Sequence, residues 1–286
     1  MKNFFNISDL DYQDIIQILR LDYQSNILQN KNIGLIFEKN STRTRLSFLA
    51  GITHLGGKPF DIRFEELNIS RDESFEDTFR AMNLYLDGII YRTTNHQNLI
   101  NSSKYFDKPI INALSDISHP CQILSDLLTL YENFKKFNLN ILWMGDMNNV
   151  CYSLVEAVNL ISDLNLTICS PKSISNNINW KLNSNVNLVD SLDKVNLNEI
   201  KCVMTDVFIS MNDEVSLDKI NVLKKYAVTS ELMSRTAEDS VFMHCLPAKV
   251  GYEVTDEVFR SHKSIVWKQA YNRMVAQKKL LQFIYQ

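Results

Sequence analysis

Residues 33–45 read IGLIFEKNSTRTR, and this stretch indicates the fold class. Its first five residues form an apolar run of the length of a buried strand, and the residues after Phe37 lead through a polar turn into a segment with helical periodicity. Ser41 is a suitable N-cap for that helix. The inward face of the helix would carry Leu46, Leu49 and Ile52. A strand, a polar turn and a helix in this order form the repeating unit of α/β proteins.

The polar turn is rich in groups that bind anions. Five consecutive residues, Ser41–Arg45, can all donate hydrogen bonds to phosphate oxygens. The backbone N–H groups of the first helical turn point to the same place, and the helix dipole favours negative charge there. An ordinary capped helix with a solvated face would explain one Ser-Thr-Arg run, but it does not require this density of donors. We therefore expect a phosphate group to be bound by Ser41, Thr42, Arg43 and Thr44.

The rest of the chain alternates short apolar runs with longer helical stretches. It opens with an amphipathic helical pattern for which Ser8 would be the cap. The further apolar runs are residues 88–91, 110–114, 141–144, 166–169, 202–207 and 241–244. This alternation over 286 residues predicts an α/β protein with two doubly wound parallel-sheet domains.

Two helical stretches are expected to join these domains. One runs over residues 121–134 and is followed by a polar segment, and the other runs over residues 268–285. The first domain would then comprise residues 1–134, with the C-terminal helix 268–286 packing back on it. The second domain would comprise residues 135–267.

Three further polar residues follow predicted strands of the first domain. Arg92 comes after the run that ends at Tyr91, while His119 and Gln122 lie at the start of the helix after the next run. In a doubly wound sheet, ligands bind outside the carboxyl ends of the strands. His119 and Gln122 could there hold a carbonyl oxygen and an amide nitrogen. Taken alone, Arg92 would more often be a surface residue and His119 a capping or core residue.

Composition excludes several classes of function. The formal net charge of −3 provides no positive field for nucleic acid or an anionic membrane. The five cysteines are odd in number and contain no CxxC pair, which argues against a disulfide framework or a structural zinc site. We find neither a signal-peptide pattern nor an apolar run of membrane-spanning length. These features indicate a cytoplasmic protein with no nucleic-acid or membrane partner.

Several motifs resemble the aspartate and ornithine carbamoyltransferase family. Those of the first half are STRTR at 41–45, Arg92 and HPCQ at 119–122, which resemble the family's carbamoyl phosphate motifs. Those of the second half are WMGDMNN at 143–149, DVFISM at 206–211 and FMHCLPA at 242–248, which resemble the ornithine branch. The resemblance covers nearly the whole chain.

The resemblance implies transfer of a carbamoyl group from carbamoyl phosphate to the δ-amine of L-ornithine in arginine biosynthesis. It also implies a homotrimer with active sites at subunit interfaces, and neither a metal nor an organic cofactor. The residues implied for carbamoyl phosphate are Ser41, Thr42, Arg43, Thr44, Asn68, Arg92, His119, Gln122, Cys245, Leu246 and Arg273. Those implied for ornithine are Asn149, Asp206, Ser210 and Met211.

Each of the implied residues would have a chemical role. Asp206 would accept the α-ammonium of ornithine, and Asn149 with the backbone N–H of Met211 would hold its carboxylate. Cys245 is the family's candidate for taking the δ-amine proton. The oxyanion that forms at the carbamoyl carbon would be stabilised by the catalytic donors Arg92, His119 and Arg273 together with Thr44.

The sequence departs from the family's pattern and leaves rival interpretations open. Four positions carry unusual residues: Asn68 for glutamine, Phe208 for tryptophan, Asn212 for glycine and Tyr271 for glutamate. Rival acceptors are putrescine, which has no carboxylate for Asn149, and an N-acylated ornithine, which has no cation for Asp206. Two further alternatives are a catalytically silent regulatory homologue and a nicotinamide-binding protein, although the glycine fingerprint of the latter is missing.

Overall fold

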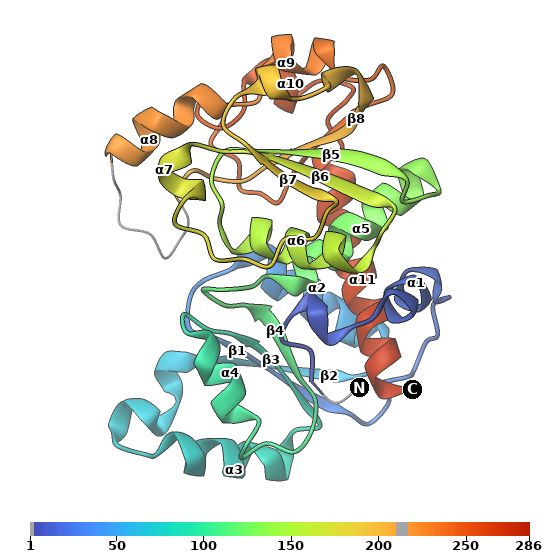
Figure 1. The fold of residues 1–286 in the computed structure, drawn as a ribbon. Helices are drawn as coiled ribbons and strands as arrows, with labels where there is room; N and C mark the ends of the chain where they lie inside the picture. Colours follow the sequence, from blue (N-terminus) through green and yellow to red (C-terminus); the bar gives the residue numbers. More distant parts are fainter. Residues whose placement is uncertain (1–2, 210–216) are drawn as a thin grey trace. The chain divides into compact units, whose positions relative to one another are not determined.

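The computed structural model describes residues 3–209 and 217–286, leaving out the side chains of Ser70 and Arg71. The chain forms two compact units. Unit 1 contains the chain up to Leu128 and again Asn272–Gln286, and unit 2 is Thr129–Tyr271. Each unit is built around one parallel sheet (Figure 1), which confirms the predicted fold class.

The sheet of unit 1 runs in the order β2-β1-β3-β4, with every pair of neighbouring strands parallel. The strands are β1 (Asn32–Phe37), β2 (Lys58–Arg63), β3 (Gly88–Arg92) and β4 (Ile110–Leu114). The helices that lie wholly in this unit are α1 (Tyr12–Arg20), α2 (Thr42–His54), α3 (Phe75–Tyr85) and α4 (His96–Ser102), with 3-10 turns η1 (Ile7–Asp9), η2 (Phe64–Glu66) and η3 (Asn68–Arg71). Strand β3 is buried along its whole length, as expected for the inner strand of a covered parallel sheet.

The sheet of unit 2 runs in the order β7-β6-β5-β8-β9, again with parallel neighbours. The strands are β5 (Leu139–Met144), β6 (Leu164–Cys169), β7 (Val186–Val189), β8 (Ile200–Thr205) and β9 (Val241–His244). The helices are α6 (Asn149–Leu160), α7 (Lys172–Ser175), α8 (Leu217–Leu223), α9 (Ser230–Arg235) and α10 (Asp256–Phe259), with 3-10 turns η4 (Leu192–Lys194), η5 (Leu197–Glu199) and η6 (Lys224–Tyr226). Apolar side chains from β5, β8 and β9 form the core beside these helices.

Each sheet contains a point at which the chain reverses the direction of strand addition. In unit 1 this point lies between β1 and β3, because β2 and β4 are added on opposite sides of this pair. In unit 2 it lies between β5 and β8 for the same reason. Doubly wound sheets bind ligands beyond the carboxyl ends of the strands at such a reversal. The residues that follow β1, β3, β5 and β8 are therefore the first place to look for a site.

Two long helices contain the boundaries between the units. The first boundary falls within α5 (Pro120–Phe134), and the second falls within α11 (Val266–Tyr285). These are the two helices that the sequence predicted as connectors. Across the part of the chain that the structure describes, every helix is either too short or too polar to span a lipid bilayer.

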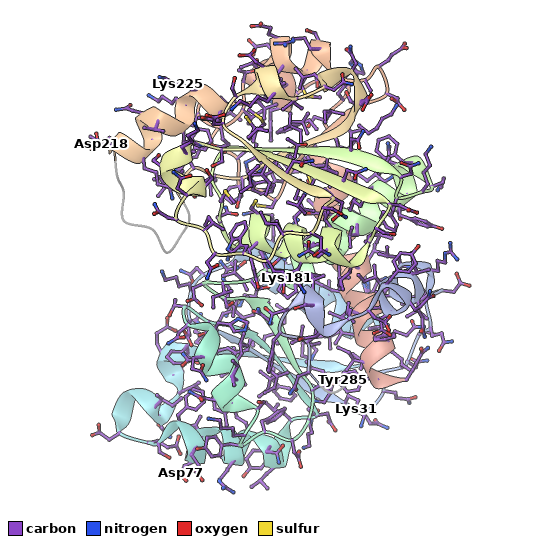
Figure 2. The ribbon with its side chains drawn as sticks, viewed as in Figure 1. Lys31, Asp77, Lys181, Asp218, Lys225 and Tyr285 are labelled. Atoms are coloured by element: carbon purple, nitrogen blue, oxygen red, sulfur yellow. The ribbon has the colours of Figure 1, made fainter. Side chains whose placement is uncertain are left out.

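The C-terminal part of α11 is anchored within unit 1. The amide of Gln282 donates to the backbone oxygen of Asp22 at 3.0 Å, and the hydroxyl of Tyr285 donates to the backbone oxygen of Asp87 at 2.9 Å. The carboxylate of Asp87 also pairs with the ammonium of Lys31 at 3.4 Å. Figure 2 shows Lys31 and Tyr285 at the same end of this unit. Hence the last residues of the chain complete the unit that the first residues begin.

Several local expectations were wrong. The first α-helix begins at Tyr12 and is capped by Asp11, not by Ser8, because the Asp11 side chain accepts from the backbone N–H of Asp14 and completes a capping box. On α2, Leu46 is 59% exposed, and the buried face is formed by Thr44, Ser47, Phe48, Gly51 and Ile52. Strands β2 and β7 were not expected at all. Both lie at the edge of a sheet and are largely exposed, so their residues lack the apolar run on which the other predictions rested.

Candidate functional site

The predicted anion-binding turn lies at the N-terminus of α2. Ser41 is the N-cap residue, and within the described structure its side chain makes no capping hydrogen bond. The first turn of the helix contains no acidic residue that would neutralise its N–H groups. Arg43 is half-buried and Thr44 is buried. This helix end can therefore offer backbone N–H groups, hydroxyls and a guanidinium to an anion.

Arg45, the last residue of the same motif, has a structural role instead. Its guanidinium forms an ion pair with the carboxylate of Asp61 at 2.6 Å and lies over the ring of Phe37, 5.9 Å from the ring centroid. Asp61 belongs to the edge strand β2. Arg45 thus ties α2 to the neighbouring strand, and its charge is already compensated.

Arg273 brings together three residues that are far apart in the sequence. Its Nη2 donates to the hydroxyl of Thr44 at 2.8 Å, and its Nη1 donates to the side-chain oxygen of Gln122. The amide of Gln122 in turn donates to Asp126 at 2.8 Å. Arg273, Thr44 and Gln122 are all buried, and all belong to unit 1. The guanidinium is consequently fixed beside the N-terminus of α2.

His119 lies next to two buried arginines. Its pKa is held well below the usual value, mainly by burial and further by the positive charges of Arg273 and Arg92. The imidazole is therefore neutral near pH 7 and can donate one hydrogen bond without adding charge. Cys121, two residues later, has its pKa raised to about 12 by burial, which excludes it as a nucleophile.

Glu38 organises the strand ends in unit 1, and sequence reasoning overlooked it. Its Oε1 accepts from the hydroxyls of Tyr91 at 2.6 Å and Thr93 at 2.8 Å, and its Oε2 accepts from the backbone N–H of Thr94 at 2.8 Å. Burial and the Glu38 charge together raise the pKa of Tyr91. Because Arg92 lies between two of these donors, Glu38 fixes the position of Arg92 relative to the end of β1. The available signal was an acidic residue directly after a buried strand.

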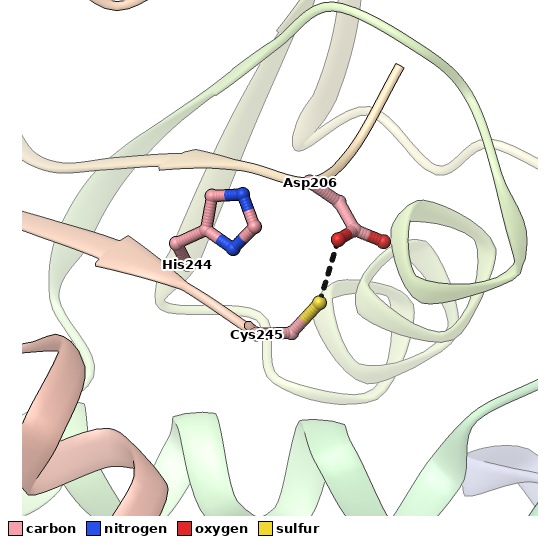
Figure 3. A group of neighbouring side chains, drawn as sticks. All are labelled: Asp206, His244 and Cys245. Atoms are coloured by element: carbon pink, nitrogen blue, oxygen red, sulfur yellow. Dashed lines mark hydrogen bonds between the residues drawn. The ribbon is translucent and has the colours of Figure 1, made fainter. Parts of the chain in front are cut away.

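In unit 2, the carboxylate of Asp206 follows β8 and is held on both sides. The thiol of Cys245 donates to Oδ1 at 2.7 Å (Figure 3), and the side-chain amide of Asn148 donates to Oδ2 at 2.7 Å. Asp206 is buried, whereas Cys245 and Asn148 are half-buried. Asn149, the predicted binding residue, is the first residue of α6 and directly follows Asn148. The carboxyl ends of β5, β8 and β9 therefore present a carboxylate, a thiol and amides at one place.

A buried pair supports the backbone beside Cys245. Nδ1 of His244 accepts the backbone N–H of Leu246 at 2.9 Å, so the ring proton is on Nε2, which donates to Glu253 at 3.1 Å. Glu253 is fully buried, and it also accepts the backbone N–H of Lys249. Since the N–H of Leu246 is already used, the carbonyl oxygen is the backbone group that Leu246 can offer to a ligand.

Asp206, His244 and Cys245 also form a cluster of possible metal ligands. Their ligand atoms all lie within 4.8 Å of one another (Figure 3). However, both ring nitrogens of His244 make hydrogen bonds, to Leu246 and Glu253. A metal could bind here only if the imidazole gave up one of these bonds. The geometry therefore fits a group of side chains held together by hydrogen bonds better than it fits a metal centre.

The turn after β5 makes two further contacts in unit 2. Asp146 accepts from the ammonium of Lys219 on α8 at 2.9 Å. Gly145 has a φ of +102°, and a Cβ at this position would lie 2.9 Å from the ring of Phe208. Phe208, which stands where the family usually has tryptophan, is buried against this glycine. The turn thus contacts residues on both sides of the undescribed segment 210–216.

The structure brings most of the predicted site residues into two clusters, one in each unit. Ser41, Thr42, Arg43, Thr44, Arg92, His119, Gln122 and Arg273 belong to unit 1, and Asn149, Asp206, Cys245 and Leu246 belong to unit 2. Ser210 and Met211, as well as the departure at Asn212, lie outside the described residues. Asn68 is exposed in η3, and among the described residues its side chain makes no hydrogen bond or ion pair to either cluster. Sequence reasoning overlooked Glu38, Asn148 and Glu253. Each of them forms hydrogen bonds with a predicted site residue or with its neighbours in the chain.

Comparison with known protein families finds matches in both halves of the chain. Residues 2–132 match the model of the carbamoyl-P binding domain of aspartate/ornithine carbamoyltransferases. Residues 137–284 match the model of the Asp/Orn binding domain of the same family. Together the two models cover nearly the whole sequence.

Individual relatives are similar over their full length. The ornithine carbamoyltransferase of Methanosphaera stadtmanae is 37% identical, with 100% of this chain and 99% of that protein covered. That of Methanococcus vannielii is 39% identical, with 95% and 93% covered. Among solved structures, the anabolic ornithine carbamoyltransferase of Campylobacter jejuni has a TM-score of 0.89 at 30% identity, with 99% of each chain covered. The Thermus thermophilus enzyme has a TM-score of 0.88 at 28% identity, with 100% and 99% covered.

Proposed function

Because the chain belongs to the aspartate/ornithine carbamoyltransferase family, we propose that it transfers the carbamoyl group of carbamoyl phosphate to the δ-amine of L-ornithine. The products are L-citrulline and phosphate. The observation that carries the choice of acceptor is the buried carboxylate of Asp206, held by Cys245 and Asn148. Ornithine carries two ammonium groups and one carboxylate, so a buried carboxylate favours this net cation over aspartate, which is a net anion with two carboxylates.

Carbamoyl phosphate binds to the cluster of unit 1. Its phosphate lies at the N-terminus of α2, on the hydroxyls of Ser41, Thr42 and Thr44 and the guanidinium of Arg43. The bonds from Arg273 to Thr44 and Gln122 support this proposal, because they hold a second cation at the same helix end. Gln122 and the carbonyl of Leu246 bind the carbamoyl amide. Asn68 belongs to the same binding set, and its exposed position suits a contact to a neighbouring subunit.

Ornithine binds to the cluster of unit 2. Asp206 accepts the α-ammonium group, while Asn149, Ser210 and the backbone N–H of Met211 bind the α-carboxylate. With the α-end fixed in this way, the δ-amine is presented to the carbamoyl carbon, and positioning supplies much of the rate.

The δ-amine must lose a proton before or during its attack. An alkylamine like that of lysine has a pKa of about 10.4, so ornithine arrives as the ammonium form near neutral pH. The thiol of Cys245 donates to Asp206, so we propose that its sulfur accepts the δ-amine proton while the thiol proton passes to Oδ1 of Asp206. The nitrogen then forms a bond to the carbamoyl carbon, and the bond from this carbon to the phosphate oxygen breaks.

Negative charge develops on the carbamoyl oxygen as the carbon becomes tetrahedral. Arg92, Arg273, His119 and Thr44 are the donors that stabilise it. The neutral state of His119 is compatible with this role, because a neutral imidazole still donates one hydrogen bond and adds no positive charge beside Arg92 and Arg273. Phosphate leaves into the same group of arginines.

A comparison of acceptors tests the proposal. Purified protein is supplied with carbamoyl phosphate and, in parallel, with ornithine, putrescine, an N-acylated ornithine or aspartate, and phosphate and citrulline are measured. We expect turnover with ornithine to exceed that with the other three. Comparable turnover with putrescine would exclude a role for the carboxylate contacts, and comparable turnover with the acylated amine would exclude the ion pair to Asp206. The absence of acceptor-dependent phosphate release with every amine would identify a catalytically silent homologue.

Assembly and location follow the same proposal. We infer a homotrimer with active sites at the subunit interfaces, which would give the exposed Asn68 a partner, and a role in arginine biosynthesis. All five cysteines are free thiols, and four of them are buried, which supports the reducing conditions of the cytoplasm. Light scattering of the purified protein tests whether it forms a homotrimer.

A further inference from the structure

Asn148 uses both ends of its side-chain amide at once. Its Oδ1 accepts the backbone N–H groups of Val150 and Cys151 at 3.0 and 3.1 Å, which caps α6. Its Nδ2 donates to Oδ2 of Asp206 at 2.7 Å. The residue therefore connects the start of α6, which follows β5, with the end of β8. The sheet reverses its direction of strand addition between β5 and β8.

Helix capping alone does not explain this residue. Serine, aspartate and asparagine are about equally good N-caps, so capping would leave the choice open. Among these three at neutral pH, asparagine alone offers an acceptor together with an amide donor. The short contact to Asp206 uses this donor.

Clamping from two sides fixes the orientation of the Asp206 carboxylate. Oδ1 accepts from Cys245 and Oδ2 accepts from Asn148, so rotation of the carboxylate would break at least one bond. Both donors are neutral in this arrangement. The carboxylate consequently keeps its negative charge for a cationic ligand, whereas a lysine or arginine in place of Asn148 would cancel it.

We propose that Asn148 is a positioning residue for the acceptor substrate, acting by holding the Asp206 carboxylate toward the ammonium group of the amine. This inference rests on the function proposed above. It predicts that loss of the amide donor impairs recognition of ornithine but leaves recognition of carbamoyl phosphate unchanged.

Three substitutions separate positioning from helix capping. Asn148→Ser keeps a capping oxygen but is too short to reach Asp206, and Asn148→Ala removes both functions. We expect Asn148→Ser to unfold at the same urea concentration as the wild type and to raise the KM for ornithine about tenfold or more, because a hydrogen bond to a charged group is lost. The KM for carbamoyl phosphate should stay at the wild-type value. Asn148→Ala should show the same change in KM together with lower stability.

Asn148→Asp adds a readout that a structural role would not change. Two facing carboxylates share a proton, which can replace the amide donor at low pH but is lost as the pH rises. The other groups near this pair are the imidazole of His244, the thiols of Cys245 and Cys151, and Asp146 with its partner Lys219. These are unchanged in the variant. The ratio of variant to wild-type kcat/KM for ornithine should therefore fall as the pH rises, whereas the ratio for Asn148→Ser should stay level.

The outcomes distinguish this inference from the function on which it rests. Failure of the wild type to form citrulline would reject the proposed function. If the wild type is active, a wild-type KM for ornithine in Asn148→Ser would overturn the positioning role, and so would an Asn148→Asp ratio that does not change with pH.

Discussion

At the scale of single residues, the neutral state of His119 makes stability depend on pH. Its pKa in the folded protein is well below the unfolded value of 6.5, so below this pH the unfolded chain binds a proton that the folded chain does not. Stability is therefore lost as the pH falls through 6.5. At about pH 5.5 the loss amounts to roughly 1.4 kcal/mol relative to about pH 7.5. Urea unfolding at the two pH values measures it.

The variant His119→Gln provides the control for this prediction. It cannot titrate, so its loss of stability over the same pH interval should be smaller than that of the wild type. His96, whose pKa is also lowered by burial, is present in both proteins and contributes equally. Identical pH dependence in the two proteins would contradict the assignment to His119.

Two arginines of one motif should differ in their effect on catalysis. Arg43 lies on the first turn of α2 and is proposed to bind phosphate, whereas Arg45 is engaged by Asp61 and Phe37. We expect Arg43→Ala to remain folded and to lower turnover roughly a hundred- to thousand-fold, as for the loss of a transition-state donor. Arg45→Ala should keep most activity and lose about 1 kcal/mol of stability at most. Steady-state kinetics and urea unfolding of both variants test this contrast.

The residues that touch a ligand were easier to predict from sequence than those that support them. Thr44 and Gln122 belong to recognisable motifs and Arg273 is implied by the family resemblance, and the structure places the three in contact. Glu38 and Asn148 were overlooked because their partners, on β3 and after β8, come close only when the sheets form. A sequence pattern shows which groups a residue offers, but it does not show which of them are already satisfied.

At the scale of elements, the turn after β5 depends on a glycine. Gly145 combines a φ of +102° with a Cβ position only 2.9 Å from the ring of Phe208. Gly145→Ala should therefore cost about 1 to 2 kcal/mol for the backbone and a further 1 to 3 kcal/mol for the contact. Displacement of Phe208 should also raise the KM for ornithine, because Asp206 is only two residues away. Urea unfolding and acceptor kinetics measure the two effects.

Gly251 offers a matched control in the same unit. Its φ is +90°, but a Cβ there would have no heavy atom within 4 Å. Gly251→Ala should therefore show the backbone cost without the contact cost or the change in KM. Equal losses in the two variants would mean that the contact with Phe208 has no effect.

Central elements were predictable from sequence, but edge elements were not. The inner strands are apolar runs because both of their faces are covered. Strand β2 reads KPFDIR and is mostly exposed, so its pattern resembles that of a loop. Its place in the sheet is set by parallel pairing with β1, from Lys58 beside Asn32 to Arg63 beside Phe37, which is a non-local interaction.

At the scale of the whole molecule, unit 1 is built from two segments that are distant in the chain. Its C-terminal segment supplies Arg273 to the site and includes Tyr285, whose hydroxyl donates to the backbone oxygen of Asp87. The sequence predicts this helix. Where the helix docks, however, depends on how closely the ring of Tyr285 approaches the backbone at the start of β3. Gly88 provides this approach, because a Cβ there would lie 2.0 Å from the hydroxyl oxygen of Tyr285.

A double-mutant cycle tests whether this approach anchors the chain end. Gly88→Ala alone should cost about 1 to 3 kcal/mol by overpacking, and Tyr285→Phe alone about 1 kcal/mol for the lost hydrogen bond. In the double variant the clashing oxygen is absent, and the nearest remaining atoms are the backbone oxygen of Pro109 and the ring carbon Cζ of Tyr285, each at 3.3 Å. The combined loss should therefore be smaller than the sum by roughly 1 kcal/mol. Strictly additive losses in urea unfolding would show that the end of α11 does not dock against the start of β3.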